Sequence, residues 1–282
     1  MRKVVCRLLR LYVRHFPLRK GKIPLLRLFE LLGFFNGVEL ETTICSRTRV
    51  FLKLDDWVQR LVYFFGVYEF EKAETRCWLN YSKNSKSILD IGSNFGYYTL
   101  LACDQNDFVK VLAFEPAPDM FNRLSHNLRL NNYLNRVSTL NIGLSDKKGR
   151  FDFFVADDKH SGMSGLSMPE GVSGKRIQVE VDTVDSILSN NGSLLPDLVK
   201  IDVEGNELNV LNGMKHTLLT TSPVFFIEIY DKNLSRFGHS SQQVFDFFWQ
   251  HRYQVFEVQK NGQLSLITSP KDIGLAICIP SK

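Results

Sequence analysis

A short apolar strand that runs directly into a glycine turn and a helix is the feature that most constrains this chain. Residues 88–96 have the sequence ILDIGSNFG, with glycine at positions 92 and 96. Gly92 permits a tight turn or a positive φ, and Gly96 lets the helix approach the sheet closely. The free N–H groups at the start of such a helix bind anions. The stretch therefore predicts a nucleotide-cofactor loop in an α/β fold.

The middle residue of this loop, Asn94, indicates which kind of cofactor fits. A dinucleotide loop, G-x-G-x-x-G, has glycine at that position so that the backbone can approach a pyrophosphate. A cofactor without a pyrophosphate but with a carboxylate, such as S-adenosylmethionine, suits Asn94 better. A purely structural turn between strand and helix is the alternative interpretation of a lone loop of this type.

From residue 86 onward, short apolar strands alternate with amphipathic helices, which predicts a mostly parallel sheet covered on both faces. We expect the main strands at 87–91, 109–114, 137–142, 198–203, 224–229, 253–259 and 273–279. The last two are expected to be joined through Asn261-Gly262, a good turn dipeptide. Two further strands, 151–155 and 177–181, flank a loop rich in glycine and serine at 159–174, whose length predicts a substrate loop or lid.

One acidic position strengthens the cofactor prediction. Glu115 follows the second expected strand, nineteen residues beyond Gly96. An acidic side chain at that point accepts hydrogen bonds from both hydroxyls of a ribose. Taken alone, Glu115 would be interpreted as a solvated loop charge, but in register with the glycine loop it predicts ribose binding.

Charged residues at the end of the fourth main strand break the rule that a central parallel strand is nearly all apolar. Lys200, Asp202 and Glu204 lie on one face of its carboxyl end, where α/β sheets bind ligands, and Glu228 lies within the next strand. A buried ion pair between Lys200 and Glu228 or Glu204 is one interpretation. For Asp202 we favour contact with the methionine end of the cofactor or with substrate.

Four segments, in this order and spacing, resemble the FkbM-type family of S-adenosylmethionine-dependent methyltransferases. They are DIGSNFGYYT (90–99), AFEP (113–116), LSD (144–146) and KIDVEGNE (200–207). The resemblance covers residues 65–260. It implies a class I methyltransferase fold, which is an α/β Rossmann-like fold with a mostly parallel seven-stranded sheet, an antiparallel last strand and helices on both faces. It also implies methyl transfer to an oxygen of a sugar, a glycan or another small molecule.

The resemblance and the glycine loop together predict a set of residues that hold S-adenosylmethionine. Residues 141–146, after the third strand, are expected to flank its adenine. The expected cofactor-binding residues are Asp90, Gly92, Ser93, Asn94, Gly96, Glu115, Asn141, Asp146 and Asp202.

Methyl transfer to a hydroxyl needs an oriented acceptor and a base that removes its proton. His160, in the long loop, is our candidate base, and Asp202, Glu204 and Glu228 compete with it. A lone loop histidine is more often a bystander. The three carboxylates are also suited to Mg²⁺, although nothing in their spacing demands a metal, and we predict none.

Positive charge is concentrated in the first 29 residues. They contain nine Lys or Arg and no acidic residue, whereas residues 30–282 contain 26 basic and 30 acidic side chains. The catalytic part thus offers no positive field for nucleic acid, which we exclude as a partner. We expect a basic, partly helical segment at 1–60 and a methyltransferase catalytic domain at 61–282.

The first segment has the pattern of an amphipathic helix with a basic face. Lys3, Arg7, Arg10 and Arg14 recur at helical spacing, with apolar residues largely between them. Peripheral contact with an anionic membrane and packing of the helix on the catalytic domain are equally open interpretations. An Arg-rich targeting peptide is a weaker one. The oligomeric state is left open by the sequence.

Five scattered cysteines without a C-x-x-C pair argue against a disulfide framework and a zinc site. No apolar run reaches the roughly 18 residues of a membrane-spanning helix. We therefore expect a soluble, cytoplasmic protein, with membrane association left open. The alternative functions are a non-catalytic domain that binds an adenosine ligand and an N-methyltransferase, which lacks support because no Asn-Pro-Pro-Tyr-like motif follows the fourth strand. A nicotinamide-dependent dehydrogenase is disfavoured by Asn94.

Overall fold

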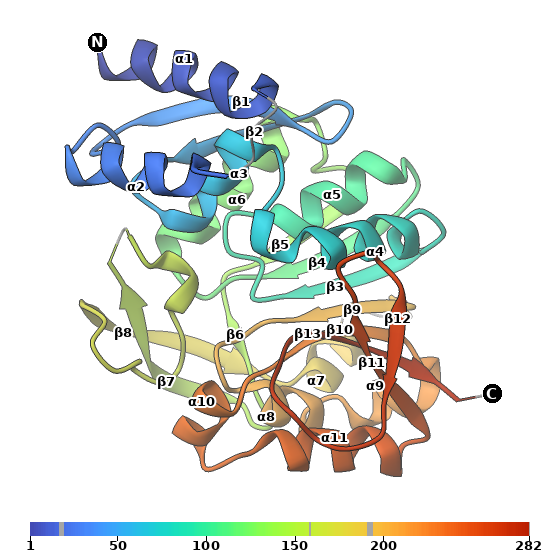
Figure 1. Ribbon diagram of the computed structural model, residues 1–282. Coiled ribbons are helices and arrows are strands. Elements are labelled where there is room, and N and C mark those ends of the chain that lie inside the picture. The colour runs from blue at the N-terminus through green and yellow to red at the C-terminus, as the bar shows by residue number, and fades with distance from the viewer. Residues whose placement is uncertain (17–19, 158, 191–193, 282) are drawn as a thin grey trace.

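A central eight-stranded sheet organises the protein, as seen in a computed structural model that describes residues 1–16, 20–157, 159–190 and 194–281 (Figure 1). The strand order is β12-β11-β13-β10-β9-β3-β4-β5. The strands of this sheet are β3 (Ser87–Ile91), β4 (Lys110–Phe114), β5 (Val137–Leu140), β9 (Leu198–Ile201), β10 (Val224–Ile229), β11 (Tyr253–Val258), β12 (Leu264–Ile267) and β13 (Ile273–Pro280). Strands β10, β9, β3, β4 and β5 are parallel, and β13 runs antiparallel to its neighbours β10 and β11. The predicted α/β fold with an antiparallel last strand is confirmed.

The eighth strand corrects one detail of the expected topology. The Asn261-Gly262 turn leads from β11 into β12, which pairs antiparallel with it, and not directly into β13. The sequence LSLI of β12 is only four residues long, and its burial is low except at Ile267. An edge strand this short and exposed carries too weak a pattern to be distinguished from a loop.

Side chains alternate between two hydrophobic clusters on the two faces of the sheet. Ile88 and Leu198 point into the cluster that contains α4, α5 and α6, and their neighbours Leu89 and Val199 point into the cluster that contains the later helices. The first face is covered by α4 (Lys72–Ser82), α5 (Tyr97–Gln105) and α6 (Pro118–Leu130). The second is covered by α7 (Val184–Asn190), α8 (Glu207–Asn212), α9 (Lys215–Thr221) and α11 (Ser241–Gln250). Both faces of the sheet are therefore closed to solvent.

A separate three-stranded sheet carries the long glycine- and serine-rich loop. It is formed by β6 (Gly143–Leu144), β7 (Gly149–Ala156) and β8 (Gly174–Asp182), in the order β6-β8-β7. Phe153 and Val179 of this sheet pack with Met120 of α6 in a third small cluster. Strands β7 and β8 form an antiparallel hairpin, and the described part of their connecting loop contains a 3-10 turn, Ser161–Met163.

The residues before 66 form an N-terminal layer of helices and a hairpin. Its elements are α1 (Arg2–His15), α2 (Lys22–Leu31), β1 (Glu39–Ile44), β2 (Thr48–Lys53) and α3 (Trp57–Phe65). Cys6, Leu9 and Val13 of α1 are buried in the same hydrophobic cluster as β3 and α5. The first helix therefore packs on the rest of the protein through one apolar side. Within the described ranges, no helix combines the length and hydrophobicity that crossing a bilayer requires.

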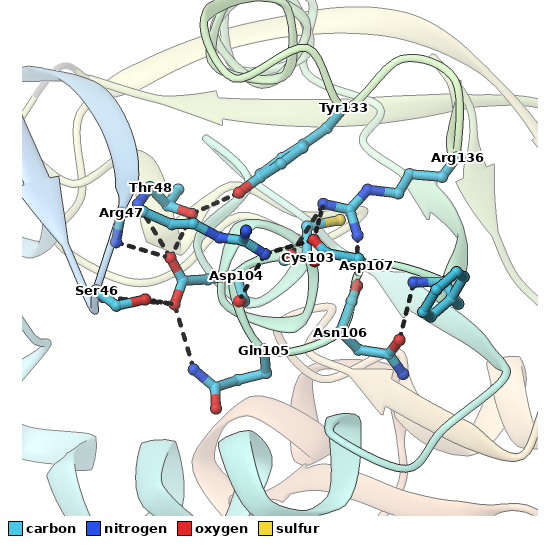
Figure 2. A network of polar contacts seen from close by, with 11 residues as sticks. Ser46, Arg47, Thr48, Cys103, Asp104, Gln105, Asn106, Asp107, Tyr133 and Arg136 are labelled. Atoms are coloured by element: carbon cyan, nitrogen blue, oxygen red, sulfur yellow. Dashed lines mark hydrogen bonds and ion pairs between the residues drawn. The ribbon is translucent and has the colours of Figure 1, made fainter.

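One buried carboxylate fastens the β1–β2 hairpin to the end of α5 (Figure 2). Asp104 accepts hydrogen bonds from the backbone N–H of Arg47 and from the hydroxyls of Ser46 and Thr48, the last two at 2.8 Å. Burial opposes the charge on Asp104, but these hydrogen bonds prevail and lower the pKa of its carboxyl. The N-terminal layer is thus held by hydrogen bonds to an ion as well as by apolar contacts.

Candidate active site

A cavity of about 360 Å³ opens at the carboxyl ends of β3, β4, β9 and β10. This edge of an open α/β sheet is where ligands bind. The lining includes the glycine loop, the residues after β4 and β5, the acidic end of β9 with Glu228, the loop after β7, and residues from α3 and the segment that follows it. The expected cofactor loop and the expected acidic residues therefore share one cavity.

The turn after β3 depends on the absence of a side chain at Gly92. Its φ is +83°, and a Cβ atom there would lie 1.9 Å from the carbonyl oxygen of Asp202. The N–H groups of Gly92 and Ser93 both donate to the carbonyl of Phe114, at 3.0 and 2.9 Å. The loop thus passes directly against the chain that leaves β9, and residues 92–95 form one wall of the cavity.

Two of the predicted cofactor residues lie outside this wall. Asp90 is buried, and its carboxylate accepts hydrogen bonds from the N–H and hydroxyl of Thr99, at 3.1 and 2.5 Å. It accepts hydrogen bonds from the first turn of α5 and is not one of the residues that line the cavity. At Gly96 a Cβ atom would meet Leu124 at 2.6 Å, so this glycine allows α6 to approach, and it does not line the cavity.

Glu115 lines the cavity, as the sequence predicted, and its two oxygens are already oriented. One accepts the N–H of Asn94 at 2.7 Å and the other accepts the N–H of Ala117 at 2.8 Å. Burial raises the pKa of this carboxyl to about 7, although the two backbone hydrogen bonds oppose the shift. Each oxygen keeps a further lone pair for a hydroxyl donor.

The loop after β5 contributes apolar residues instead of the expected polar ones. Asn141 donates to the carbonyl oxygens of Glu115 and Pro116, at 2.7 and 3.1 Å, and Asp146 is exposed beyond the cavity. Ile142 and Leu144 line the cavity between them. An apolar wall suits the flat face of an adenine, and Asn141 holds this wall against the end of β4.

The acidic residues at the ends of β9 and β10 meet at the other side of the cavity. One carboxylate oxygen from each of Asp202, Glu204 and Glu228 lies within 4.8 Å of the others. The pairing of β9 with β10 brings the three together, since Lys200 and Ile201 are in register with Phe226 and Ile227. Such a cluster offers oxygen ligands to a cation or bases to a substrate hydroxyl.

Lys200 is buried and forms an ion pair, but with a different partner from those expected. Its ammonium lies 2.8 Å from a carboxylate oxygen of Asp202 and 4.8 Å from the centre of the Tyr98 ring. Burial alone would lower the pKa of Lys200, but Asp202 and Glu71 beside it prevail and raise it. Among the described residues, Lys200 thus forms its ion pair with Asp202 and not with Glu204 or Glu228.

Glu204 and Glu228 are held together by neutral and cationic donors on the segment after β10. The amide of Asn233 donates to both, at 3.0 Å to Glu204 and 3.3 Å to Glu228, and Arg236 lies 3.6 Å from Glu204. Burial, followed by repulsion from Asp202, raises the pKa of Glu204 to about 8 and raises that of Glu228 well above its ordinary value. The pair therefore retains a proton near neutral pH.

The long loop covers part of the cavity. Its Ser161 is buried and donates through its hydroxyl to Asp56 at 2.5 Å, which fixes the loop on the start of α3. His160 also lines the cavity, and its Nδ1 lies 2.8 Å from a carboxylate oxygen of Asp157, while its side chain is 46% exposed. The predicted lid position and the candidate base are thus both present at the cavity.

Several cavity residues were not predicted from the sequence. Trp57, Tyr68 and Glu71 come from α3 and the segment before α4, where the sequence analysis named no site residue. The Tyr98 hydroxyl donates to Glu71 at 2.5 Å. The one usable signal was the acidic Glu71 within an aromatic stretch, since a buried carboxylate needs a partner.

Comparison with known proteins identifies a protein family and several relatives. The model of the methyltransferase FkbM domain matches residues 90–255. The hexuronic acid methyltransferase AglP of Haloferax volcanii is 31% identical over 160 residues, which cover 57% of this chain and 62% of the relative. The 2-O-methyltransferase NoeI of Sinorhizobium fredii is 29% identical over 160 residues, covering 52% and 64%. This chain thus spans less than two thirds of the length of either relative.

Among solved structures, the methyltransferase FkbM of Methylobacillus flagellatus aligns with 79% of this chain and 54% of its own, at 17% sequence identity and a TM-score of 0.45. The match of the FkbM domain covers more than half of the present chain. This protein belongs to the methyltransferase FkbM domain family, a family of S-adenosylmethionine-dependent methyltransferases.

Proposed function

We propose that this protein transfers the methyl group of S-adenosylmethionine to a hydroxyl oxygen of a sugar, a glycan or a similar small molecule. The observation that carries the proposal is the cavity that joins the Glu115 side of the glycine loop to the Glu204–Glu228 pair. One side suits a ribose, and the other suits the removal of a hydroxyl proton.

The residues of the glycine loop fit the cofactor. Gly92 has no room for a Cβ atom, and Glu115 offers two oriented carboxylate oxygens to the ribose hydroxyls. Ile142 and Leu144 provide the apolar wall for the adenine, and residues 92–95 line the space beside it. When bound, S-adenosylmethionine supplies an electrophilic methyl group.

The acidic cluster would orient the acceptor and take its proton. Asp202, paired with Lys200, accepts a hydrogen bond from a neighbouring hydroxyl, and the reacting hydroxyl passes its proton to the Glu204–Glu228 pair. A buried carboxyl with a raised pKa is a stronger base than an exposed one once it is ionised. His160 is the competing base, and its exposure on the loop makes it the weaker candidate.

The sugar class is supported by two observations. Carboxylates accept hydrogen bonds from several hydroxyls at once, and the named relatives act, by their names, on a hexuronic acid and at a 2-O position. A sensor that only binds an adenosine ligand would not need three clustered carboxyls, because burying them costs stability without improving affinity for adenosine. The cluster thus favours catalysis over binding alone.

Calorimetry with S-adenosylmethionine on the wild type and on Glu115→Gln tests the cofactor half. Loss of a charged acceptor for the ribose should weaken binding by about 1 to 3 kcal/mol, while the exposed Glu170→Gln should leave it unchanged. Transfer of a labelled methyl group to a panel of hexuronic acids, neutral sugars and matched amino sugars tests the acceptor. Absence of cofactor binding to the folded wild type would refute the proposal, and methylation of amines alone would replace oxygen with nitrogen as the acceptor atom.

A further inference from the structure

The first helix carries two apolar stripes, and the protein buries only one of them. Cys6, Leu9 and Val13 face the hydrophobic cluster. On the opposite side Val4, Leu8 and Leu11, which we name the outer stripe, are 57%, 62% and 57% exposed. Their spacing of four and three residues places them on one face of the helix. The outer stripe is therefore not needed to hold α1 on the protein.

The second helix adds exposed leucines to the same layer. Leu28 and Leu31 of α2 and Leu32 directly after it are 52%, 85% and 63% exposed. Figure 1 shows α1 and α2 at the outside of the N-terminal layer, at the end of the molecule away from α11. Apolar side chains that gather on one end of a protein mark an interaction surface more often than single exposed leucines do.

Basic side chains run alongside the outer stripe. Lys3 and Arg7 each precede a residue of the stripe by one position, and both are exposed. No acidic residue occurs before Glu30, whereas the first 29 residues contain nine Lys or Arg. A second copy of this chain would bring the same positive charge to the contact and repel it. An anionic lipid surface offers both the apolar interior and the opposite charge.

We propose that the outer face of α1, helped by the exposed leucines of α2, binds the surface of an anionic lipid bilayer. The leucines enter the boundary between headgroups and acyl chains, and Lys3 and Arg7 contact the headgroups. The helix that carries this surface is tied to the active-site region through its other side. It packs on α3, and the first residue of α3, Trp57, lines the cavity, with the guanidinium of Arg27 5.7 Å from the centre of its ring.

Sedimentation of the full-length protein with lipid vesicles tests the proposal without any methyl transfer, so its outcome is independent of the proposed function. The vesicles consist of phosphatidylcholine alone or with about 30% phosphatidylglycerol, at about 0.1 M salt. We expect binding to the anionic vesicles, at least tenfold weaker binding to the neutral ones, and loss of binding as salt is raised.

Two pairs of variants distinguish the surface from general stickiness. Leu8→Ser with Leu11→Ser should weaken vesicle binding by about tenfold to a hundredfold, whereas Leu134→Ser with Leu219→Ser, which are also exposed, should not. Lys3→Glu with Arg7→Glu should weaken it by about tenfold or more, and the exposed pair Lys83→Glu with Lys86→Glu should not. All four leucines are exposed, so folding is retained.

Three results would overturn the proposal. They are no binding of the wild type to anionic vesicles, equal binding to neutral vesicles, and unchanged binding of the Leu8 and Leu11 variant. Light scattering after gel filtration tests whether a second copy of the chain binds this face instead. A wild-type dimer that becomes a monomer in that variant, without vesicle binding, would assign the outer stripe to a second copy of the chain.

Discussion

The two ends of the cavity are built in different ways. The proposed cofactor end consists of the turn after β3 and Glu115 after β4, and these two strands are consecutive in the chain and paired in the sheet. The acceptor end is assembled from α3, the loop after β7, and the ends of β9 and β10. A backbone turn specifies the first end, and tertiary packing of distant segments specifies the second.

The carboxylates at the two ends are also held in different ways. Both oxygens of Glu115 are fixed by backbone N–H groups that belong to the turn itself. Glu204 and Glu228 share one amide, that of Asn233, and stand beside a third carboxylate, Asp202. The cofactor end is thus organised to accept hydrogen bonds in one geometry, whereas the acceptor end is organised to hold or release a proton.

Gly92→Ala should have the largest effect of all, on cofactor binding and on stability. The new Cβ atom would lie 1.9 Å from the carbonyl oxygen of Asp202, at a φ of +83°. We expect cofactor affinity to fall by on the order of a hundredfold or more and unfolding stability to fall by about 3 kcal/mol, because backbone on both sides must move. Calorimetry and chemical denaturation measure the two effects.

Gly171→Ala is the matched control for this substitution. Its φ is +74°, but no heavy atom within 4 Å meets the added Cβ. It should cost only about 1 kcal/mol and leave cofactor binding intact. Equal losses at both glycines would mean that backbone strain alone, and not the approach to Asp202, explains Gly92.

Glu204→Gln should stop the chemistry at the acceptor end while sparing the cofactor end. We expect kcat to fall by about a hundredfold to ten-thousandfold as the base is lost, with little change in cofactor affinity. Because burial and Asp202 raise the pKa of Glu204 to about 8, wild-type kcat/KM should rise with pH until about 8. The base must be ionised, and it is increasingly ionised as pH rises through that value.

His160→Ala provides the comparison for Glu204→Gln. A side chain that only lines the cavity should change kcat by less than about tenfold and keep the rise with pH. If His160→Ala lost the larger part of kcat and Glu204→Gln did not, the loop histidine would be the base. The acceptor end would then depend on the loop more than on the sheet.

The same contrast explains what the sequence could and could not predict. The glycine turn and Glu115 were found because backbone conformation and strand register act over neighbouring residues. The proximity of Asp202, Glu204 and Glu228 followed from the rule that parallel strands end at one edge. Trp57 and Tyr68 were missed, because no local pattern links them to β9. Asp90 was predicted to hold the cofactor, and one of its carboxylate oxygens accepts both hydrogen bonds from Thr99, an interaction that the sequence pattern did not indicate.

The pKa of Glu115 gives a smaller, pH-dependent effect at the cofactor end. Burial raises this pKa from 4.5 to about 7, so below pH 7 the carboxyl holds a proton and accepts fewer hydrogen bonds from a ribose. Cofactor affinity should therefore increase by up to about tenfold per pH unit as pH approaches 7 and then level off. Glu115→Gln should lack this part of the pH dependence when both proteins are titrated by calorimetry.

Unfolding of the protein without cofactor should show the reverse dependence on pH for the same residue. A carboxyl whose pKa is higher in the folded state binds its proton more tightly there, so its stabilisation is full below its unfolded value of 4.5. The stabilisation is lost as pH rises through about 7. A difference in unfolding free energy between the wild type and Glu115→Gln that does not change from pH 5 to pH 8, about the range of this titration, would contradict the assignment.

Ser161→Ala should give the smallest effect and a sharp test of the acceptor end. The Ser161 hydroxyl donates to Asp56 at 2.5 Å and holds the loop after β7 against α3, although neither residue belongs to the glycine loop. Losing a hydrogen bond to a charged group should weaken the attachment of the loop by about 1.5 to 3 kcal/mol. We expect KM for the acceptor to rise by a few-fold to tenfold as a result. Cofactor affinity should stay unchanged, as should both constants in Ser173→Ala, an exposed serine of the same loop. Weaker cofactor binding in Ser161→Ala would show that the loop supports both ends of the cavity. A hydrogen bond that positioned only the acceptor end would leave cofactor affinity unchanged.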